Sequence, residues 1–414
     1  MAFIKAFKGI RPNTEVVEKV SCLPYDVMNR EEAKDMAKDN PYSFLHVVRS
    51  EIDFNDDVSQ YDDRVYKRAR ENLDKMIQKG ILEQESTESI YIYRQIMKDK
   101  VQTGIVGCTS IDDYMNDIIR KHEFTRPEKE EDRIKNFDYC NANTAPIFLT
   151  YRKNDHINNI VNNWIDAHNP IFDFTTEDGI THMVWNIYRE EVIKDIIDIF
   201  KGINYLYIAD GHHRSASAVK VGLKRREQNK DFTGEEEFNY FLSVLFPDED
   251  LYIMDYNRVV KDLNGNTEKE FLNKIAKNFI IEEVKGNDPY KPTEKHTFGM
   301  YLTGKWYKII AKEGIFDKNH PVERLDVSIL QKNILNPILG IDDPRTNKRI
   351  DFIGGIRGMG ELEKRVNTDM KVAFSVYPTT VEDLIDIADE GMIMPPKSTW
   401  FEPKLRSGLF VHRL

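Results

Sequence analysis

The feature that most constrains the fold is the stretch LYIADGHHRSASAVKVG, residues 206–222. Residues 206–209 are apolar and predict a buried strand, Asp210 and Gly211 form a tight turn, and a helix is expected from Ser215 to about residue 229. Another helix is predicted at about 189–201, just before the strand. Strands that alternate with helices in this way indicate a mixed α/β fold.

The turn between this strand and this helix has the residue types of a phosphate site. It places Gly211, His212, His213 and Arg214 at a helix N-terminus, where unpaired backbone N–H groups and the helix dipole favour an anion. Gly211 allows close approach of the backbone, and Arg214 and one histidine can donate to phosphate oxygens, with Ser215 completing the set. Asp210 is predicted to hold a metal ion or to orient a histidine.

The same residues have two other interpretations. Asp210 could cap the helix, with the two histidines merely exposed. Zinc binding by His212 and His213 is disfavoured, because adjacent helical positions diverge by about 100° and the usual paired ligand spacings are absent. Several hydrogen-bonding side chains at one strand-to-helix turn favour the phosphate site.

Composition and length limit the class of protein. A chain of 414 residues with 40% hydrophobic and 31% charged residues is expected to be soluble, globular and divided into domains, here near residue 262. The net charge of −11 disfavours DNA and anionic membranes as partners. Three cysteines without C-x-x-C spacing, no signal peptide and no apolar run of about 18 residues together predict a cytoplasmic protein.

Local patterns predict several further elements. Asn29 and Glu32 form a capping box at the start of a helix over 30–38. The apolar spacing in 62–79 predicts an amphipathic helix that ends before Gly80. We also expect hairpins formed by 89–97 with 101–111 and around the turn at 303–304, and a helix near 326–339.

The motif ADGHHRSASAVKVG resembles the signature of the ParB/sulfiredoxin-like superfamily, in which a strand ending in D-G-x-H-R or G-x-x-R precedes a phosphate-binding helix. Together with LPYDV, KHEFTRP, DYNRVVKDLNG, RIDFIGGIRG and MPPKSTWFEPKLRSGLF, it resembles a prokaryotic family catalogued as a domain of unknown function, often labelled SpoOJ/ParA/ParB/RepB family protein. The resemblance spans nearly the whole chain. It implies a ParB/sulfiredoxin-like core with insertions in 1–262 and an additional α/β region in 263–414 that completes the site.

The resemblance also implies phosphate chemistry on a nucleotide. Superfamily members include free serine kinases, ParB proteins that bind and hydrolyse CTP, and sulfiredoxin. The D-G-H-H-R form is most similar to the serine kinases, so Asp210, His212, His213 and Arg214 would occupy phosphate-binding positions. Sulfinic reductase activity is not expected, because His212 stands where sulfiredoxin has the cysteine of G-C-H-R. A DNA clamp is not expected either, because no helix-turn-helix is clear and the chain is acidic.

Phosphoryl transfer also needs a base and further cations. Tyr25 and Asp26 lie in a short predicted loop, where Asp26 would act as base or metal ligand or, as an equal alternative, cap the helix from residue 30. In KHEFTRP, His122, Glu123 and Arg126 are candidates for an acid–base group and a phosphate clamp, the alternative being plain surface charge.

The C-terminal part adds candidate anion donors. Arg357 follows a strand that ends in two glycines, a pattern that tight packing explains equally well. The proline-stiffened segment 394–410 is predicted to close over a ligand, the alternative being a rigid tail. Its candidate anion donors are Lys397, Ser398, Thr399, Lys404, Arg406 and Ser407.

These observations lead to one main hypothesis. The chain is expected to transfer phosphate from ATP or ADP, with Mg²⁺ at Asp210, to a small metabolite, and free serine or phosphoserine is the best substrate guess. Asp26, Glu123, Asp210 and His213 would be catalytic. The alternatives are a phosphoserine phosphatase or nucleotide hydrolase and, from another class, a non-catalytic nucleotide-binding ParB-like regulatory protein. A homodimer is left open.

Overall fold

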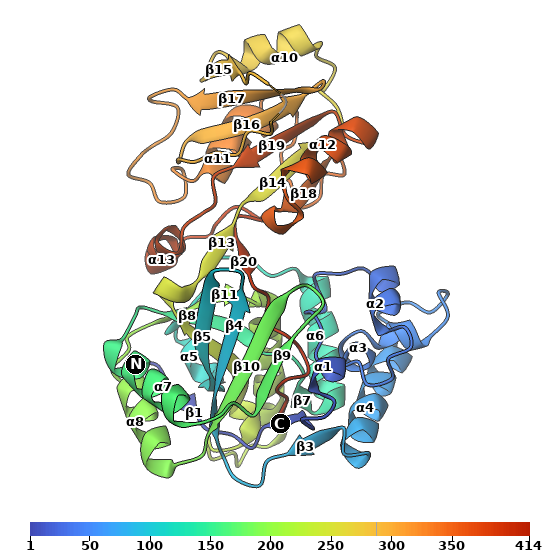
Figure 1. The fold of residues 1–414 in the computed structure, drawn as a ribbon, viewed down its shortest axis with the longest axis vertical. Helices are drawn as coiled ribbons and strands as arrows, with labels where there is room; N and C mark the ends of the chain where they lie inside the picture. Colours follow the sequence, from blue (N-terminus) through green and yellow to red (C-terminus); the bar gives the residue numbers. More distant parts are fainter. Residues whose placement is uncertain (287) are drawn as a thin grey trace. The chain divides into compact units, whose positions relative to one another are not determined.

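The computed structural model describes residues 1–286 and 288–414 and divides into two compact units. Unit 1 comprises Met1–Leu251 and Pro403–Leu414, and unit 2 comprises Tyr252–Glu402 (Figure 1). Each unit contains helices and a sheet, so the predicted mixed α/β class is confirmed. Residue 262, near which a domain division is predicted, lies inside unit 2. Among the described helices, none is both long and apolar enough to cross a membrane.

The main sheet of unit 1 mixes parallel and antiparallel pairs. Its strand order is β6-β11-β8-β12-β5-β4-β10-β9, with β1 paired to β5. The pairs β6–β11 and β8–β12 are parallel and the other pairs are antiparallel. The strands are β1 (Ile4–Lys5), β4 (Ile90–Met97), β5 (Lys100–Ser110), β6 (Ile119–Arg120), β8 (Ile147–Tyr151), β9 (Phe172–Thr175), β10 (Ile180–Ile187), β11 (Leu206–Asp210) and β12 (Tyr240–Pro247).

The remaining elements of unit 1 are helices and short strand pairs. The helices are α1 (Val17–Val20), α2 (Arg30–Ala37), α3 (Leu45–Val48), α4 (Asp63–Gln78), α5 (Ile111–Met115), α6 (Pro127–Cys140), α7 (Asp155–Ala167), α8 (Glu190–Phe200) and α9 (His212–Gln228). The short strands are β2 (Ile10–Pro12) with β3 (Leu82–Gln84), and β7 (Ala142–Asn143) with β21 (His412–Arg413).

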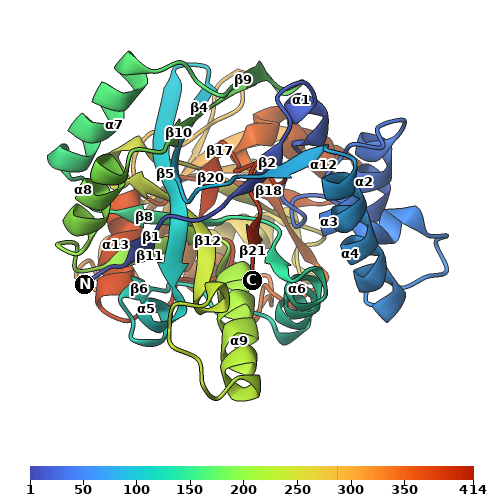
Figure 2. The same ribbon diagram turned by 90° about the horizontal axis from the view of Figure 1, so that it is seen from below.

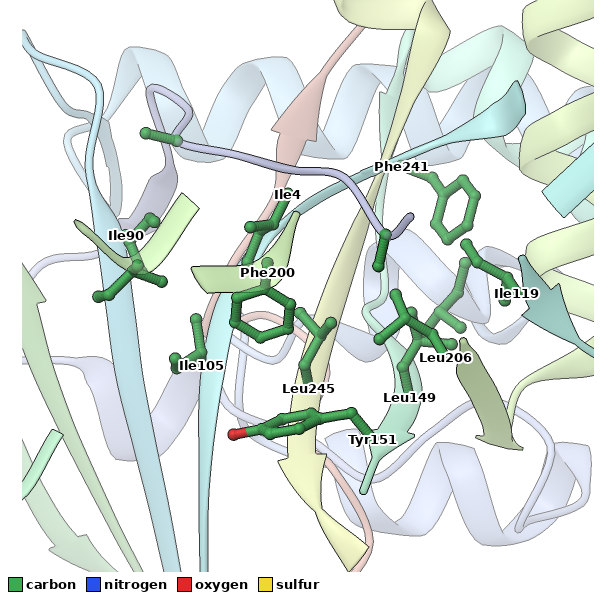
Figure 3. Close-up of a cluster of buried hydrophobic side chains, with 14 of the residues drawn as sticks. Ile4, Ile90, Ile105, Ile119, Leu149, Tyr151, Phe200, Leu206, Phe241 and Leu245 are labelled. Carbon is green, nitrogen blue, oxygen red and sulfur yellow. The ribbon is translucent and has the colours of Figure 1, made fainter. Parts of the chain in front are cut away.

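The core of unit 1 lies between the main sheet and its helices. Strands β8 and β12 are buried along their whole length, which explains their nearly continuous apolar sequences. Figure 3 shows part of this core, in which Tyr151 of β8, Leu245 of β12 and Phe200 of α8 belong to one apolar cluster. The rings of Tyr151 and Phe200 meet edge to face with centroids 5.2 Å apart. A second cluster joins α2, α3 and α4.

Several local predictions are confirmed in unit 1. The capping box of Asn29 and Glu32 is present at the start of α2. Helix α4 occupies the predicted segment and Gly80 follows it, and β4 and β5 form the predicted hairpin. Helix α9 starts at His212, three residues before the predicted start at Ser215. The helix begins earlier because Gly211, at φ +99°, turns the chain in a single residue.

Unit 2 is built on a sheet with the order β15-β17-β16-β19-β14-β18, in which the neighbouring strands are antiparallel. The predicted hairpin at 303–304 is confirmed as β16 and β17. The strands are β13 (Tyr252–Met254), β14 (Tyr256–Val260), β15 (Phe279–Glu283), β16 (Thr297–Leu302), β17 (Lys305–Ala311), β18 (Ile350–Gly354), β19 (Val372–Val376) and β20 (Trp400–Glu402), with β13 paired to β20. The helices are α10 (Glu268–Ile275), α11 (Asp326–Leu330), α12 (Met359–Thr368) and α13 (Val381–Asp389).

The helix predicted near 326–339 differs from the expectation. The α-helical part, α11, ends at Leu330, and a π-helical segment, η4 (Gln331–Leu335), follows it directly. The apolar periodicity of the sequence does not reveal this change, because a single wider turn shifts the face of only the residues that follow it.

Packing of α9 against its neighbours predicts a stability effect at Gly222. A Cβ added there would collide with the Phe238 carbonyl oxygen and come within 2.8 Å of Ile111 Cδ1. We expect Gly222→Ala to lower the free energy of unfolding by about 1–3 kcal/mol, although alanine favours helices. Urea denaturation would measure this. Gly360→Ala on α12 is the matched control, since an added Cβ meets nothing within 4 Å there. Equal effects of the two substitutions would contradict the prediction.

Candidate phosphate site

Strands β6 and β11, the first two strands in the order of the main sheet, position the site. They run parallel, with Leu206 opposite Ile119, so their carboxyl ends meet at one edge of the sheet. Helix α6 follows β6 after the loop 121–126, and α9 follows β11 after Gly211 alone. In α/β sheets, ligands bind outside the carboxyl ends of parallel strands.

Helices α6 and α9 pack side by side (Figure 2). The Arg126 N–H donates to His213 Nε2 over 3.0 Å, and the Ser217 hydroxyl donates to the Glu130 carbonyl over 2.9 Å. Further along, Lys224 Nζ donates to Asp138 Oδ2 over 2.6 Å. Because the residue numbers of both partners rise together, the two helices are parallel and their N-termini lie next to each other.

Neither of these N-termini is capped by a side chain. The N-cap residues are Arg126 for α6 and Gly211 for α9, and within the described chain neither makes a side-chain capping bond. Two helix dipoles therefore place their positive ends together. This arrangement suits an anion with several oxygens, such as a chain of phosphates.

Two buried histidines lie at the same place. His122 from the loop after β6 and His212 from the first turn of α9 are 1% and 5% exposed, and their rings meet edge to face with centroids 4.4 Å apart. Burial lowers the pKa of His122 to about 4 and lowers the pKa of His212 well below its usual value. Both are neutral at pH 7. In the described structure neither ring nitrogen of His122 has a hydrogen-bond partner, which is costly in a buried group.

Asp210 supplies a negative charge beside the helix start. Burial would raise the pKa of Asp210, but the nearby cations Lys404 and Arg214 outweigh it and hold that pKa well below its usual range. Lys404 Nζ and Arg214 Nη2 each lie 3.5 Å from Asp210 Oδ2. The Asp210 side chain remains 30% exposed, so the ionised carboxylate is partly accessible to solvent.

Arg214 supports the turn from inside. Its side chain is 2% exposed, and its guanidinium donates to the Pro146 carbonyl oxygen and contacts Asp210. The arginine thus links β11 to the residue that precedes β8. The prediction that Arg214 binds phosphate directly stays a prediction.

The structure brings most of the predicted unit 1 residues into this site. Glu123 Oε2 lies 3.9 Å from His212 Nδ1, and His213 accepts a hydrogen bond from Arg126. The Ser215 hydroxyl is buried and donates to the carbonyls of Gly211 and His212, so it is used within the helix. The predicted residues gathered around the start of α9 are His122, Glu123, Arg126, Asp210, Gly211, His212, His213, Arg214 and Ser215.

Tyr25 and Asp26 lie beside another buried cluster. The Arg133 guanidinium is 3.9 Å from the centre of the buried Tyr25 ring, and Arg133 pairs with Asp132. Burial and the nearby Asp26 carboxylate raise the pKa of Tyr25. Asp26 itself is exposed. The alternative that Asp26 caps α2 is wrong, because Asn29 is the N-cap of that helix.

Arg406 belongs to a different cluster of unit 1. It forms an ion pair with Asp178 and donates to His182 Nε2 over 3.3 Å and to Thr176 Oγ1 over 3.0 Å. With Cys22 and other residues it lines a cavity of about 600 Å³. Its positive charge is therefore balanced inside the protein.

Other predicted C-terminal residues belong to unit 2. Arg357 is exposed at the end of a single 3₁₀ turn, Gly355–Arg357, and Lys397 is also exposed. Ser398 is buried, and its hydroxyl donates to the Pro395 carbonyl over 2.6 Å. Their predicted role as anion donors stays a prediction.

Sequence reasoning missed the pairing of Lys404 with Asp210. The lysine is recognisable as one of several cations in a basic C-terminal segment, but nothing local relates it to residue 210. The return of Pro403–Leu414 to unit 1 creates this contact.

A divalent cation would have few protein ligands here. Within the described residues, no group of three or more His, Cys, Asp or Glu side chains could hold a metal ion. Mg²⁺ commonly uses one or two carboxylates and completes its shell with water and substrate phosphates. Asp210 and Glu123 fit that pattern, because both carboxylates are partly exposed beside the helix N-termini.

Comparisons with known proteins give one family and several remote structural likenesses. Residues 4–328 match the family described as Protein of unknown function (DUF1015). The search of curated proteins finds no match.

Similar solved structures include a free serine kinase in complex with AMP, at 13% identity and a TM-score of 0.35, covering 74% of this chain and 89% of that chain. A conserved hypothetical protein from Pyrococcus furiosus is 13% identical with a TM-score of 0.36, covering 77% and 98%. SbnI with C-terminal truncation, from Staphylococcus aureus, is 10% identical with a TM-score of 0.40, covering 74% and 87%.

Proposed function

The chain belongs to the family described as Protein of unknown function (DUF1015), and from the site in unit 1 we propose that it transfers a phosphoryl group from a nucleotide to a small metabolite. The observation that carries this proposal is the pair of adjacent, parallel helix N-termini at α6 and α9, neither capped by a side chain within the described residues. A polyphosphate supplies the oxygens that such a pair of N-termini can bind.

The neutral histidines support the same proposal. His122 has two ring nitrogens without partners in the described structure, and a neutral imidazole can donate one hydrogen bond and accept another. A bound phosphate or hydroxyl group would supply these partners. His213 is half-buried at the junction of the two helices, and in this proposal it contacts the phosphates.

The carboxylates would provide the acid–base chemistry. Glu123 lies against His212 and is the better placed base for an acceptor hydroxyl, and Asp26 is the second candidate. Asp210 would hold Mg²⁺ together with the nucleotide phosphates, and bound Mg²⁺ would neutralise phosphate charge during transfer. Lys404 would balance Asp210 when no cation is bound.

The nature of the acceptor rests on the resemblance of ADGHHR to the free serine kinases. We propose free serine as the acceptor and ATP or ADP as the donor. Phosphorus NMR of the full chain with Mg²⁺ and ATP, ADP or CTP, with and without serine, and separately with phosphoserine, tests this directly. A new phosphomonoester signal that requires serine is the expected result.

The other outcomes would each assign a different function. Phosphate released from phosphoserine alone would indicate a phosphatase, and nucleotide cleavage without serine would indicate a hydrolase. Unchanged spectra with nucleotide binding in calorimetry would indicate a non-catalytic regulatory protein.

A substitution at His213 tests whether the helix N-termini bind the nucleotide. We expect His213→Ala to weaken nucleotide binding by about 10- to 100-fold, as for the loss of a hydrogen bond to a charged group. Titration calorimetry would measure the change. Glu227→Ala, at the exposed far end of α9, is the matched control and should bind normally. If His213→Ala retained full affinity, the site would lie elsewhere.

A further inference from the structure

Unit 2 contains a cavity of about 360 Å³ with a buried arginine in its wall, called the Arg258 cavity here. Its apolar wall comes from Val327, Leu335, Phe352, Pro395 and Pro396. Its polar lining comes from Arg258, Gln331, Asp342, Asp343 and Arg345. An apolar wall with a small number of placed polar groups is typical of a small-molecule site.

Arg258 is unusual among the buried arginines of this protein. It lies on β14 opposite Phe352 and is 3% exposed. Its guanidinium donates to the carbonyl oxygens of Tyr256 and Lys397, the latter over 2.9 Å, and within the described residues it forms no ion pair with a carboxylate. By contrast, Arg214 and Arg406 each lie against an aspartate.

The uncompensated charge has an energetic cost. Burial lowers the pKa of Arg258 to about 10. The two carbonyl bonds use only two of the five guanidinium N–H groups. A buried cation is stabilised when an anion completes its hydrogen bonds, so the wall of this cavity is prepared for a negatively charged group.

The surroundings limit the size of that negative charge. Arg345 at the cavity is paired with Asp343 at 2.8 Å, so it adds no net charge, and Asp342 lines the cavity as well. A dianion such as phosphate would place its second charge near these aspartates. Among the described residues of the cavity wall, Arg258 is the arginine that has no carboxylate partner, and one carboxylate matches its charge.

We propose that the Arg258 cavity binds a small monocarboxylate with an apolar body. The carboxylate forms a charge-assisted pair with Arg258, and the apolar body packs against Phe352, Val327 and the two prolines. This site lies wholly within unit 2 and does not depend on the function proposed for unit 1.

The backbone beside the cavity supports a ligand role. Gln331 and Leu335, the first and last residues of the π-helical segment η4, both line the cavity. π-Helical turns are rare and are frequently found at functional sites. Here the wider turn shapes the wall that faces the ligand.

Binding of defined probes to the full chain tests the proposal. Sodium phenylacetate and 3-methylbutanoate are the monocarboxylate probes, phenylacetamide is the neutral analogue, and phenyl phosphate is the dianion. Saturation-transfer NMR and calorimetry should show a carboxylate Kd of about 1 mM or tighter for ligands of this size. Both phenylacetamide and phenyl phosphate should bind at least about tenfold more weakly.

Two variants locate the binding. Arg258→Met removes the cation, and Val327→Phe fills the cavity while retaining Arg258; each should weaken phenylacetate binding at least about tenfold. Arg349→Met, which removes a cation paired with Asp262 in the same unit, should bind normally. Thermal unfolding verifies that each variant is folded. If Arg258→Met does not fold, the binding measured for Val327→Phe decides whether the ligand occupies this cavity.

Three results would overturn the proposal. The first is that the wild-type protein does not bind the carboxylates at a ligand concentration about 20-fold above the expected Kd. The second is that phenylacetamide or phenyl phosphate binds as tightly as phenylacetate. The third is that folded Val327→Phe binds phenylacetate as tightly as the wild-type protein.

Discussion

Replacing Arg214 with methionine is expected to lower the free energy of unfolding by about 3 kcal/mol, because it removes one partner from a buried polar cluster. Methionine fills much of the same volume, so lost packing contributes little. The Pro146 carbonyl loses a charge-assisted hydrogen bond, and Asp210 keeps only Lys404 as a neighbouring cation. The cost is lower than for a fully enclosed pair, because Asp210 is partly exposed to water.

Guanidinium chloride denaturation of Arg214→Met and the wild-type protein measures this loss. Arg214→Lys refines the argument, because an ammonium keeps the charge but cannot bridge two acceptors with a planar fork, and it should lose an intermediate amount. Glu227→Ala on the exposed end of the same helix should change stability by less than about 0.5 kcal/mol. A change of that small size in Arg214→Met would mean that the arginine does not support the turn.

Arg214→Lys also distinguishes two roles of Arg214, structural support of the turn and direct binding of the nucleotide. If Arg214 acts only by holding Asp210 and Pro146, folded Arg214→Lys should bind nucleotide nearly normally. If it contacts phosphate, as the sequence predicts, Arg214→Lys should bind more weakly even where its stability is largely retained.

Local features of this site could be predicted because they depend on neighbouring residues. A strand, a glycine turn and a helix follow one another directly in 206–228, and the residue types at the turn indicate an anion site. The predicted start of the helix, Ser215, lies three residues after its observed start at His212. The helix starts directly after Gly211 because that residue has a positive φ, which the sequence alone does not reveal.

The long-range features could not be predicted in the same way. His122 and His212 were both candidates, but their contact depends on the parallel pairing of β11 with β6, a strand of two residues that carries almost no pattern. The basic segment around Arg406 predicts a ligand role for this residue, whereas its partner Asp178 lies 228 residues earlier in the chain. A sequence shows which residues carry a positive charge, but only the fold determines which carboxylate lies beside each of them.

The second large effect concerns acid and the buried His182. Arg406 Nε–H donates to His182 Nε2 over 3.3 Å, so that nitrogen must be unprotonated, and Nδ1 lies 2.7 Å from the Tyr93 hydroxyl. Burial and the Arg406 charge lower the pKa of His182 to about 3. In the unfolded chain the pKa of histidine is about 6.5.

The sign of the effect follows from proton binding. Between about pH 6.5 and pH 3 the unfolded chain holds a proton on His182 that the folded chain does not, so stability falls as the pH falls through this range. Between pH 7 and pH 5, His182 alone is expected to reduce the free energy of unfolding by about 2 kcal/mol. His122 and His212 act in the same direction, because their pKa values are also lowered.

A substitution isolates the contribution of His182. His182→Gln retains a hydrogen-bond acceptor for Arg406 but cannot be protonated, so its loss of stability from pH 7 to pH 5 should be smaller than that of the wild-type protein by about 2 kcal/mol. Urea denaturation at both pH values measures the two losses. His156→Gln, at an exposed position on α7, should lose as much as the wild-type protein. Equal losses in His182→Gln and the wild-type protein would mean that His182 is protonated in the folded chain, and the hydrogen bond from Arg406 would then be absent.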